Sequence, residues 1–510
     1  MKPAQAVGTT ERASKTSKPS DELRIAVTFR RRQDRLGPTK LAARLSSASI
    51  NSFHPDPVDM DKALHELSQR GFRLTAKGKL TASVRGPRKL FEQTFGTRLK
   101  QFNLSKAQNC SAHSFYFPPP GAPWNPDPAI MDLIDDAYIQ WPHIYMGKKK
   151  KKKKPAQSSI SATPPHVNYF HLEMPLDVPR LLNASRVHLA GGTGKGIRVV
   201  MIDSGFFHSH PYFTSHGYSS SVVLANGAAN VKQDGNGHGT GESANIFGVA
   251  PGATFIGVKL DNESDPQGGA SILEGFQEAI KHSPHVISCS MGYDLCPSDP
   301  ATGRRTSNVP LPTLPNNLVA LEAEIQAAVA SGVVVVFSAG NGHVSFPGMM
   351  PEVISAGGVF VDQNGNMQAS DYASAFPSRI YSGRNVPDFC GLVGMQPHAD
   401  YIMLPIPPGC EIDNENAAHD GTAVRDGWGV FSGTSAAAPQ LAGVCALLRE
   451  KNPSATPAEI KSTLQRTCVD VTSGSSNSAS NNGVALTAGI GVDSATGGGL
   501  VDAFAAWNQI

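Results

Sequence analysis

The stretch "GIRVVMID", residues 196–203, decides the fold class of this chain. Apart from Arg198 it is a short apolar run rich in branched side chains, and it ends on the carboxylate of Asp203. A strand that is apolar on both faces is typical of a parallel sheet covered by helices on both sides. In such sheets functional groups sit at the carboxyl ends of the strands, which is where the sequence places Asp203.

Strands of the same buried type recur downstream and alternate with helical patterns. The strands are "TFIGVKL" (254–260), "PHVISCSM" (284–291) and "GVVVVFSAG" (332–340), and the helices are "ASILEGFQEAIKH" (270–282) and "NLVALEAEIQAAVAS" (317–331). This alternation predicts an α/β fold with a mainly parallel central sheet in a three-layer domain. Ser290 and Asn341 fall at predicted strand ends, as Asp203 does.

A different pattern precedes these strands. Strand, helix, strand, strand, helix and strand are predicted in "LRIAVTFRR" (23–31), "DMDKALHELSQRGF" (59–72), "RLTAKGKLTASVRG" (73–86, two strands), "PRKLFEQTFG" (87–96) and "TRLKQFNL" (97–104). That order is the split βαβ, or ferredoxin-like, α+β plan. A later stretch, "PDPAIMDLIDDAYI" (126–139), is predicted as one more helix.

The lysine-rich segment "GKKKKKKKPAQSSISATPP", residues 147–165, is the clearest boundary in the chain. Its adjacent lysines repel one another, and the Pro/Ser/Ala residues after them build no core. We therefore expect a disordered tail (1–22), a first domain (23–146), an exposed linker (147–170) and a second domain (171–510).

Charge is distributed unevenly between these parts. Residues 1–154 carry 29 Lys and Arg against 13 Asp and Glu, whereas the whole chain of 510 residues has a net charge of only +3. The acidic remainder is expected to attract the basic part, while the alternative is a basic arm that binds nucleic acid.

No stretch of about 18 apolar residues is present, so we expect no membrane span. The first residues lack the apolar core of a secretory signal. The compartment stays unknown, with the cytoplasm or a non-standard export route as the two expectations. Seven scattered cysteines show no zinc-finger spacing.

Four segments carry groups suited to acyl transfer. They are "VVMIDSGF" (199–206) with Asp203, "DGNGHGTGES" (234–243) with His238, "VVVVFSAGNGH" (333–343) with Asn341, and "FSGTSAAAPQLAG" (431–443) with Ser435. A serine nucleophile needs a base, and that base needs an orienting carboxylate. An amide past a strand end is suited to bind the oxyanion that forms during the reaction.

This order of motifs, from about Lys195 to Trp507, resembles the subtilisin-like serine peptidases, the subtilases. The resemblance rests on "DSG", "GHGT", "GVAPGA", "SAGN" and "SGTSAAAPQLAG". It implies that Ser435 attacks the scissile carbonyl, His238 is the base, Asp203 orients it, and Asn341 binds the oxyanion. Ser432 is the less favoured nucleophile. We expect Pro439 within the first turn of a helix that starts at Ser435, where a missing N–H costs little.

The resemblance also implies where substrate binds. An extended peptide would pair with the strand Ser290, Met291 and Gly292, and its side chain would enter a pocket between that strand and Ser338, Ala339 and Gly340. No metal ligand is assigned and no cofactor is required. Calcium binding stays open but unassigned, because the stretch after Gly241 is short where many subtilases have a longer calcium-binding loop. Glu242 is expected on an exposed helix face.

The first domain is similar in plan to subtilase propeptides, and "SVRGPRKLFEQTFGTRLKQF" (83–102) looks more like the propeptides of the sedolisins, the pro-kumamolisin type. The resemblance implies an intramolecular inhibitor whose end, "IQWPHIYMG" (139–147) or the lysine linker, reaches the cleft and is cut. The function predicted is a serine endopeptidase made as a zymogen and acting on polypeptides. The alternative is a catalytically silent, peptide-binding subtilase scaffold. Neither a membrane nor nucleic acid is expected as a partner.

Overall fold

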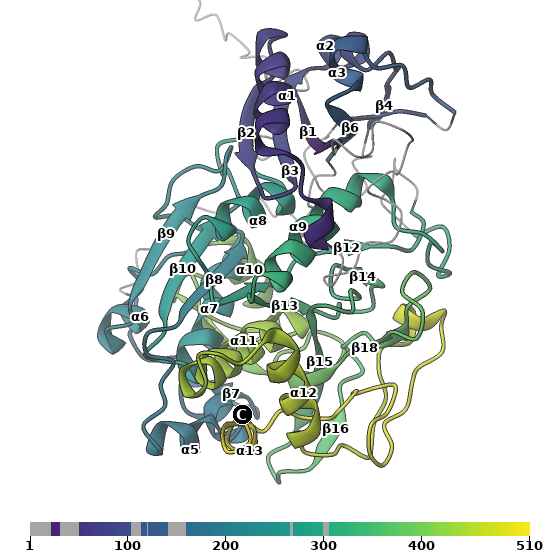
Figure 1. Ribbon diagram of the computed structural model, residues 1–510. Helices are drawn as coiled ribbons and strands as arrows, with labels where there is room; N and C mark the ends of the chain where they lie inside the picture. Colours follow the sequence, from purple (N-terminus) through teal and green to yellow (C-terminus); the bar gives the residue numbers. More distant parts are fainter. Residues whose placement is uncertain are drawn as a thin grey trace, which may run out of the picture.

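The computed structural model describes residues 22–30, 50–103, 114–119, 121–140, 160–265, 269–298 and 305–510. A smaller N-terminal part rests on a larger C-terminal part (Figure 1). The predicted tail up to residue 21 and the linker residues 147–159 lie outside the described residues. In the described part of the chain, the helices are too short or too polar to cross a membrane.

An eight-stranded sheet forms the centre of the larger part. Its order is β16-β15-β13-β11-β8-β10-β9, with β19 also pairing with β15, and every pairing is parallel except that of β15 with β16. The strands are β8 (Arg198–Asp203), β9 (Ser220–Leu224), β10 (Thr254–Lys259), β11 (Val286–Cys289), β13 (Val334–Ser338), β15 (Ile354–Val361), β16 (Met367–Ala369) and β19 (Phe389–Leu392). The mainly parallel sheet predicted from the apolar strands is therefore confirmed.

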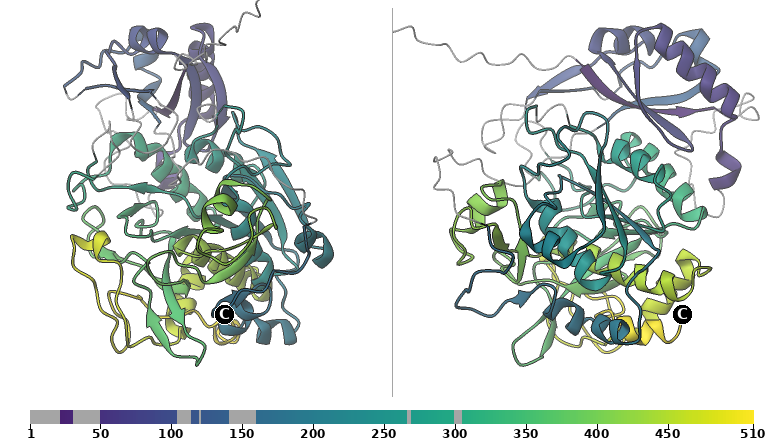
Figure 2. Two further views of the ribbon diagram at one scale, coloured as in Figure 1. Left: turned by 180° about the vertical axis from the view of Figure 1, so that it is seen from behind. Right: turned by 90° about the vertical axis from the view of Figure 1, so that its left-hand side faces the viewer.

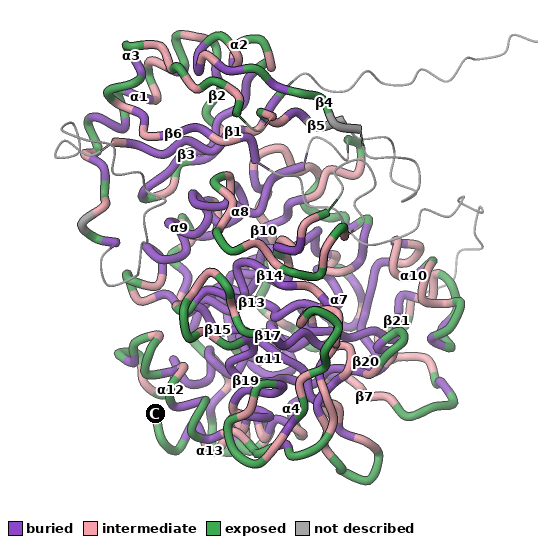
Figure 3. Tube along the Cα trace, turned by 90° about the vertical axis from the view of Figure 1, so that its right-hand side faces the viewer, coloured by how far each residue is buried: buried purple, intermediate pink, exposed green. Residues whose placement is uncertain are grey.

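Successive residues of these strands face two different helix layers. Val199 and Met201 of β8 belong to the core beneath α7 (His238–Val249) and α11 (Thr434–Lys451). Val200 and Ile202 belong to the core beneath α8 (Ile272–Ile280) and α9 (Val319–Ala330). Because both faces are covered, the strands have no polar side, and burial runs through the whole middle of the molecule (Figure 3).

The remaining elements of the larger part surround this three-layer core. The helices are α4 (Asp177–Leu181), α5 (Ala184–Leu189), α6 (Pro211–His216), α10 (Glu411–Asn416), α12 (Pro457–Thr467) and α13 (Ala503–Trp507). The small strands are β7 (Leu172–Glu173), β12 (Tyr293–Asp294), β14 (Ser345–Phe346), β17 (Phe376–Pro377), β18 (Asn385–Val386), β20 (Ile402–Pro405) and β21 (Trp428–Val430), and short 3-10 turns cover Asn316–Leu318 and Ser478–Asn481. The segment 395–428, for which the sequence shows no regular period, thus contains β20 and α10.

The N-terminal part contains a four-stranded antiparallel sheet of order β2-β3-β1-β6. The elements are β1 (Glu22–Phe29), a 3-10 turn (Ile50–Phe53), α1 (Pro57–Gln69), β2 (Arg73–Lys77), β3 (Thr81–Pro87), α2 (Arg88–Thr94), β4 (Lys100–Asn103), β5 (Ser114–Phe117), α3 (Pro128–Met131) and β6 (Ile134–Ile139). One core joins the sheet to α1 and α2. The ferredoxin-like assignment of this part stays a prediction, which this order of strands and helices supports.

Two elements of this part differ from the sequence prediction. The stretch 97–104 does not add the fourth strand to the sheet; β4 pairs instead with β5 in a separate hairpin. The helix expected over 126–139 is a single short turn, α3, followed by β6, which pairs with β1. Apolar residues spaced at 130, 133, 134 and 137 imitate a helix period, and pairing with an open edge of β1 overrides that local preference.

Candidate active site

The end of strand β8 and the start of helix α7 bring a carboxylate to an imidazole. The Nδ1 atom of His238 donates a hydrogen bond to Oδ1 of Asp203 at 2.8 Å. Asp203 is completely buried, whereas 19% of the His238 side chain is exposed. A Cβ on Gly239 would lie 2.3 Å from the carbonyl oxygen of Gly205, so only glycine lets α7 approach the end of β8 this closely.

A buried carboxylate, Asp234, holds the loop that carries His238. It accepts hydrogen bonds from the N–H of Gly237 (2.9 Å), the N–H and hydroxyl of Thr240 (3.0 and 2.6 Å) and the hydroxyl of Ser204 (3.0 Å). Burial raises the pKa of Asp234, and its hydrogen bonds oppose that shift. The imidazole is therefore positioned by a rigid, fully bonded turn and does not depend on a mobile loop.

Ser435 lies in the first turn of α11, which begins at Thr434. Pro439 lies beyond the first turn, contrary to the sequence expectation, and it cannot donate to the Ser435 carbonyl as an ordinary helix residue would. The hydroxyl of Ser290 donates to that carbonyl instead, at 2.8 Å. A residue of the predicted substrate strand thus replaces the hydrogen bond that the proline removes.

The amide of Asn341 has a fixed orientation. Its Oδ1 accepts hydrogen bonds from the N–H of Thr434 at 2.9 Å and from the Thr434 hydroxyl at 3.0 Å. The same hydroxyl accepts from the N–H of Gly340 at 3.0 Å. Because both donors bind the amide oxygen, the Nδ2 group is left to donate elsewhere, close to the start of α11.

The structure brings Asp203 to His238, and Asn341 to the residue preceding Ser435. Within the part of the chain that the structure describes, no hydrogen bond joins His238 to Ser435. Catalytic hydrogen bonds are often long before substrate binds, so this geometry does not argue against a role for either residue.

Charges around the imidazole favour its protonated form. Burial opposes protonation of His238, but the negative charge of Asp203 and its hydrogen bond outweigh that effect and raise the pKa of the imidazole. Glu242 and Asp234 add smaller contributions in the same direction. A base with a raised pKa accepts a proton from a hydroxyl more readily than a free histidine does.

Glu242 is buried, and the exposed position expected for it is wrong. Only 1% of the residue is exposed, because α11 covers helix α7 and leaves it no polar face. Its Oε2 accepts a hydrogen bond from Nδ2 of Asn245 at 2.9 Å. Burial, together with the charge of Asp203, raises the pKa of Glu242 to about 8. The charge of His238 acts in the opposite direction and lowers this pKa.

The predicted substrate-binding residues lie on two adjacent segments. Ser290, Met291 and Gly292 follow β11, and Ser338, Ala339 and Gly340 follow or end β13, the parallel neighbour of β11. The hydroxyl of Ser338 donates to the carbonyl of Ser290 at 3.0 Å. Residues 290–292 are not a regular strand but lead into β12, which pairs with β14, and a Cβ on Gly292 would lie 2.6 Å from the carbonyl oxygen of Phe346.

Sequence reasoning missed several groups that support these residues. Asp234 and Ser204 lie inside the quoted motifs, but no local pattern in the sequence indicated that their side chains form a hydrogen bond between the two loops. Thr434 lies directly before Ser435, and its orientation of Asn341 depends on a contact across 93 residues of sequence. Ser432, the less favoured nucleophile, accepts from the N–H of Gly394 at 2.7 Å and holds the preceding turn.

The N-terminal part contacts the larger part through a glutamate on α9. Glu324 accepts hydrogen bonds from the N–H groups of Lys79, Leu80 and Thr81 at 3.0, 2.9 and 2.8 Å, and from the Thr81 hydroxyl at 2.8 Å. A Cβ on Gly78 would lie 2.2 Å from a Glu324 oxygen. The carboxylate therefore encloses the turn between β2 and β3.

A second set of polar contacts joins the same sheet to α8. The hydroxyl of Thr75 donates to Glu274 at 2.7 Å, and Arg85 lies 3.4 Å from the other oxygen of that carboxylate, both charges being almost fully buried. The Ser83 hydroxyl donates to Gln277 at 2.8 Å. Figure 2 shows the four-stranded sheet lying between its own helices and the α8 and α9 layer.

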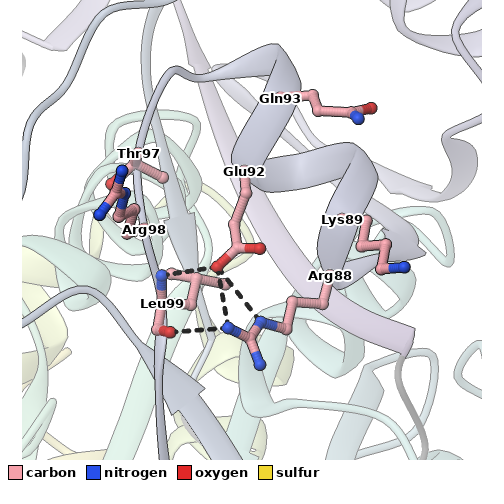
Figure 4. Close-up of a pocket in the computed structure, with 7 residues that line it drawn as sticks. All are labelled: Arg88, Lys89, Glu92, Gln93, Thr97, Arg98 and Leu99. Atoms are coloured by element: carbon pink, nitrogen blue, oxygen red, sulfur yellow. Dashed lines mark hydrogen bonds and ion pairs between the residues drawn. The ribbon is translucent and has the colours of Figure 1, made fainter.

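A surface pocket lies on the far side of the N-terminal part, at helix α2. Figure 4 shows Glu92 accepting hydrogen bonds from Arg88 (3.1 and 3.2 Å) and from the N–H of Leu99 (2.8 Å), while Arg88 donates to the Leu99 carbonyl at 3.0 Å. These bonds join α2 to the chain before β4. Among the residues that the structure describes, no cluster of His, Cys, Asp and Glu has the geometry of a metal site.

Comparison with known proteins gives consistent matches. The family model described as the subtilase family matches residues 194–491. Subtilisin E of Bacillus subtilis (strain 168) is 27% identical over 336 residues, which cover 62% of this chain and 72% of that protein. Subtilisin Savinase of Lederbergia lenta is 28% identical over 58% of this chain and 91% of its own. The crystal structure of a lanthipeptide protease is similar over 65% of this chain and 93% of its own, with 22% identity and a TM-score of 0.46.

Proposed function

Because the chain belongs to the subtilase family, and so is a serine-type endopeptidase, we propose that it cleaves peptide bonds through an acyl-enzyme on Ser435. The observation that carries the proposal is the hydrogen bond of 2.8 Å between His238 and the buried Asp203, at the strand edge that faces the start of α11. A buried aspartate bound to one ring nitrogen leaves the other nitrogen as the proton acceptor.

In the proposed reaction the Ser435 hydroxyl attacks the scissile carbonyl as Nε2 of His238 takes its proton. Asp203 holds the ring in the tautomer that leaves Nε2 free and stabilises the imidazolium that forms. The imidazolium then returns the proton to the departing amine, leaving an ester on Ser435. Water, deprotonated by the same imidazole, hydrolyses that ester and restores the serine.

Charge develops on the carbonyl oxygen during both steps. The Nδ2 group of Asn341, held by Thr434, donates to that oxygen in the proposal. The N-terminus of α11 adds the N–H of Ser435 and a positive dipole end at the same place. Fixed donors of this kind stabilise the transition state more than the substrate.

Substrate would bind as an added strand along residues 290–292, with its leading side chain between that strand and residues 338–340. The contact from Ser290 to the Ser435 carbonyl supports this placement, because it fixes the substrate strand beside the nucleophile. Polypeptide in an extended conformation is therefore the proposed substrate, with no cofactor required.

The N-terminal part is proposed to be an inhibitor domain, so that the chain is made as a zymogen. Its last described residue before the linker, Gln140, accepts a hydrogen bond from Ser271 at the start of α8. That helix follows β10, whose end is paired with Asp203. Gln140 therefore lies near the edge of the sheet that carries the candidate active site, which supports the proposal.

An active-site label tests this proposal. A fluorophosphonate should modify the full-length chain as it matures and should not modify the Ser435→Ala variant. Casein hydrolysis should fall by roughly 10⁶-fold in that variant, the loss measured for subtilisin itself. N-terminal sequencing over time should show loss of the first domain in the parent chain alone. A chain that binds peptides yet shows neither labelling nor hydrolysis would be the silent scaffold instead.

A further inference from the structure

Helix α7 carries a second buried carboxyl group beside the candidate catalytic histidine. His238 is the first residue of α7, and Glu242 lies four residues later. Side chains at that spacing lie on the same face of a helix, with Cβ atoms about 5–6 Å apart. Helical side chains also lean toward the N-terminus, so the Glu242 carboxyl extends back toward the end of the helix that carries His238.

A polar bridge fixes Glu242 between the helices of the histidine and the serine. Asn245 donates to Glu242 at 2.9 Å and accepts from Gln440 of α11 at 3.3 Å. Gln440 in turn accepts from the N–H of Leu392 at 2.7 Å. All four residues are buried, within or beside the apolar core under the sheet. A buried polar chain of this kind is costly unless every member is bonded, so it holds the carboxyl group in one place.

Around the imidazole, buried carboxyl groups outnumber the groups that can carry positive charge. One oxygen of Asp203, Oδ2, is buried with no hydrogen-bond partner among the described residues, and Asp234 is buried close by. Other titratable side chains also contact α7. His208 bonds to Ser243, and burial lowers its pKa to about 3; Cys410 is a buried thiol beside Gly237; Tyr218 stacks on Phe247; and His188 bonds to the Val249 carbonyl at the far end of the helix. At the end of α7 that carries His238, the imidazole of His238 is therefore the group of this set that can carry positive charge.

We propose that Glu242 is a positioning residue for His238, a second carboxyl group that sets the charge of the imidazole together with Asp203. The inference rests on the proposed function, in which His238 must gain and lose a proton. When Glu242 is ionised it stabilises the imidazolium, and when it is protonated it withdraws that support. His238 and Glu242 therefore titrate as a coupled pair, in two steps that belong to both groups.

The test measures the histidine directly and does not depend on turnover. Carbon-13 labelling of the histidine rings in the full-length Ser435→Ala chain allows NMR titration of His238, whose signal is identified by its absence in an added His238→Asn variant. Glu242→Gln keeps an acceptor for Asn245 but removes the charge. We expect the midpoint to fall by about one pH unit and the curve to become a single ionisation.

Three further variants make the result specific. Glu242→Asp keeps a charge and should retain the parent midpoint more closely. Glu322→Gln removes another buried carboxyl, which lies on α9 and accepts a hydrogen bond from Tyr381, and it should leave the midpoint unchanged. If Glu242→Gln does not fold, Glu242→Val, whose apolar side chain suits this core, gives the same comparison.

Kinetics then separate this inference from the function on which it rests. In chains with Ser435 intact, the acid limb of kcat/KM should move to lower pH in Glu242→Gln by the same amount as the NMR midpoint. Hydrolysis with an unchanged His238 midpoint would overturn the role of Glu242. A shifted midpoint in a chain that never hydrolyses peptide would overturn the proposed function and leave the Glu242–His238 coupling standing.

Discussion

The hydroxyl of Ser290 donates to the carbonyl oxygen of Ser435 at 2.8 Å, the carbonyl that Pro439 leaves without its helical partner. The helix therefore depends at its start on a residue of the neighbouring strand segment. The proposed nucleophile and the proposed substrate-binding segment are joined through this bond, which makes their relative position testable.

Removing that bond should displace the nucleophile. In Ser290→Ala we expect kcat/KM to fall about tenfold, which corresponds to about 1.4 kcal/mol for one lost hydrogen bond. Adding Pro439→Ala restores an N–H that donates to the same carbonyl, so the double variant should recover part of the loss. Steady-state kinetics on a peptide substrate measure both. Additive losses in the double variant would show that the bond has no such role.

Asn341 should act in the transition state and not in substrate binding. Asn341→Ala is expected to lower kcat by about 10²–10³ with little change in KM, a magnitude taken from the oxyanion amide of subtilisin. Thr434→Val removes one of the two donors that orient the amide, so a smaller loss, about tenfold, should follow. A fully active Asn341→Ala variant would exclude this assignment.

The pH dependence follows from the charge state of the base. The imidazole must be neutral to accept a proton, and Asp203 raises its pKa above the ordinary 6.5. Activity is therefore lost as pH falls through that raised pKa, and kcat/KM should increase about tenfold per pH unit below the midpoint. A profile measured on a neutral peptide substrate checks this, and maximal activity in strongly acidic solution would contradict it.

Inhibition by the N-terminal part should depend on Glu324. In Glu324→Gln the side chain has a single acceptor oxygen and presents an N–H₂ group toward the N–H groups of the β2–β3 turn. Hydrogen bonds to a charged group are worth about 1.5–3 kcal/mol, so docking should weaken about 10–100-fold. The lag before activity appears in the full-length chain should shorten accordingly.

Glu322→Gln is the matched control for that variant. Glu322 lies on the same helix two residues away and is also buried, but among the described residues it accepts a hydrogen bond from Tyr381 and none from the N-terminal part. The lag before activity appears in the Glu322→Gln chain should equal that of the parent chain. Equal lags in the two glutamine variants would mean that Glu324 does not secure the inhibitor domain.

The central sheet was predictable because its strands are apolar throughout. Their alternation with helices along the chain is compatible with few sheet topologies. Asp203 lies at the end of β8 and Asn341 follows β13, where the sequence places them. The catalytic roles assigned to these residues stay predictions.

Other features could not be read from the sequence because they depend on distant contacts. Residues 134–139 become a strand only because β1 offers an edge for pairing, and their local spacing suits a helix equally well. Glu242 is buried by a helix that begins almost 200 residues later in the chain, at Thr434. Likewise, helix α11 tolerates Pro439 because Ser290 donates a hydrogen bond to the Ser435 carbonyl, and no local sequence rule predicts that bond.

The carboxylate of Glu324 meets three main-chain N–H groups of one tight turn, and a hydroxyl is its single side-chain donor there. Main-chain donors converge in that way only after the hairpin has taken its final shape. The surface of the larger part thus recognises the conformation of this turn more than its residue identities, so unfolding of the N-terminal part is expected to release it even when its sequence is unchanged.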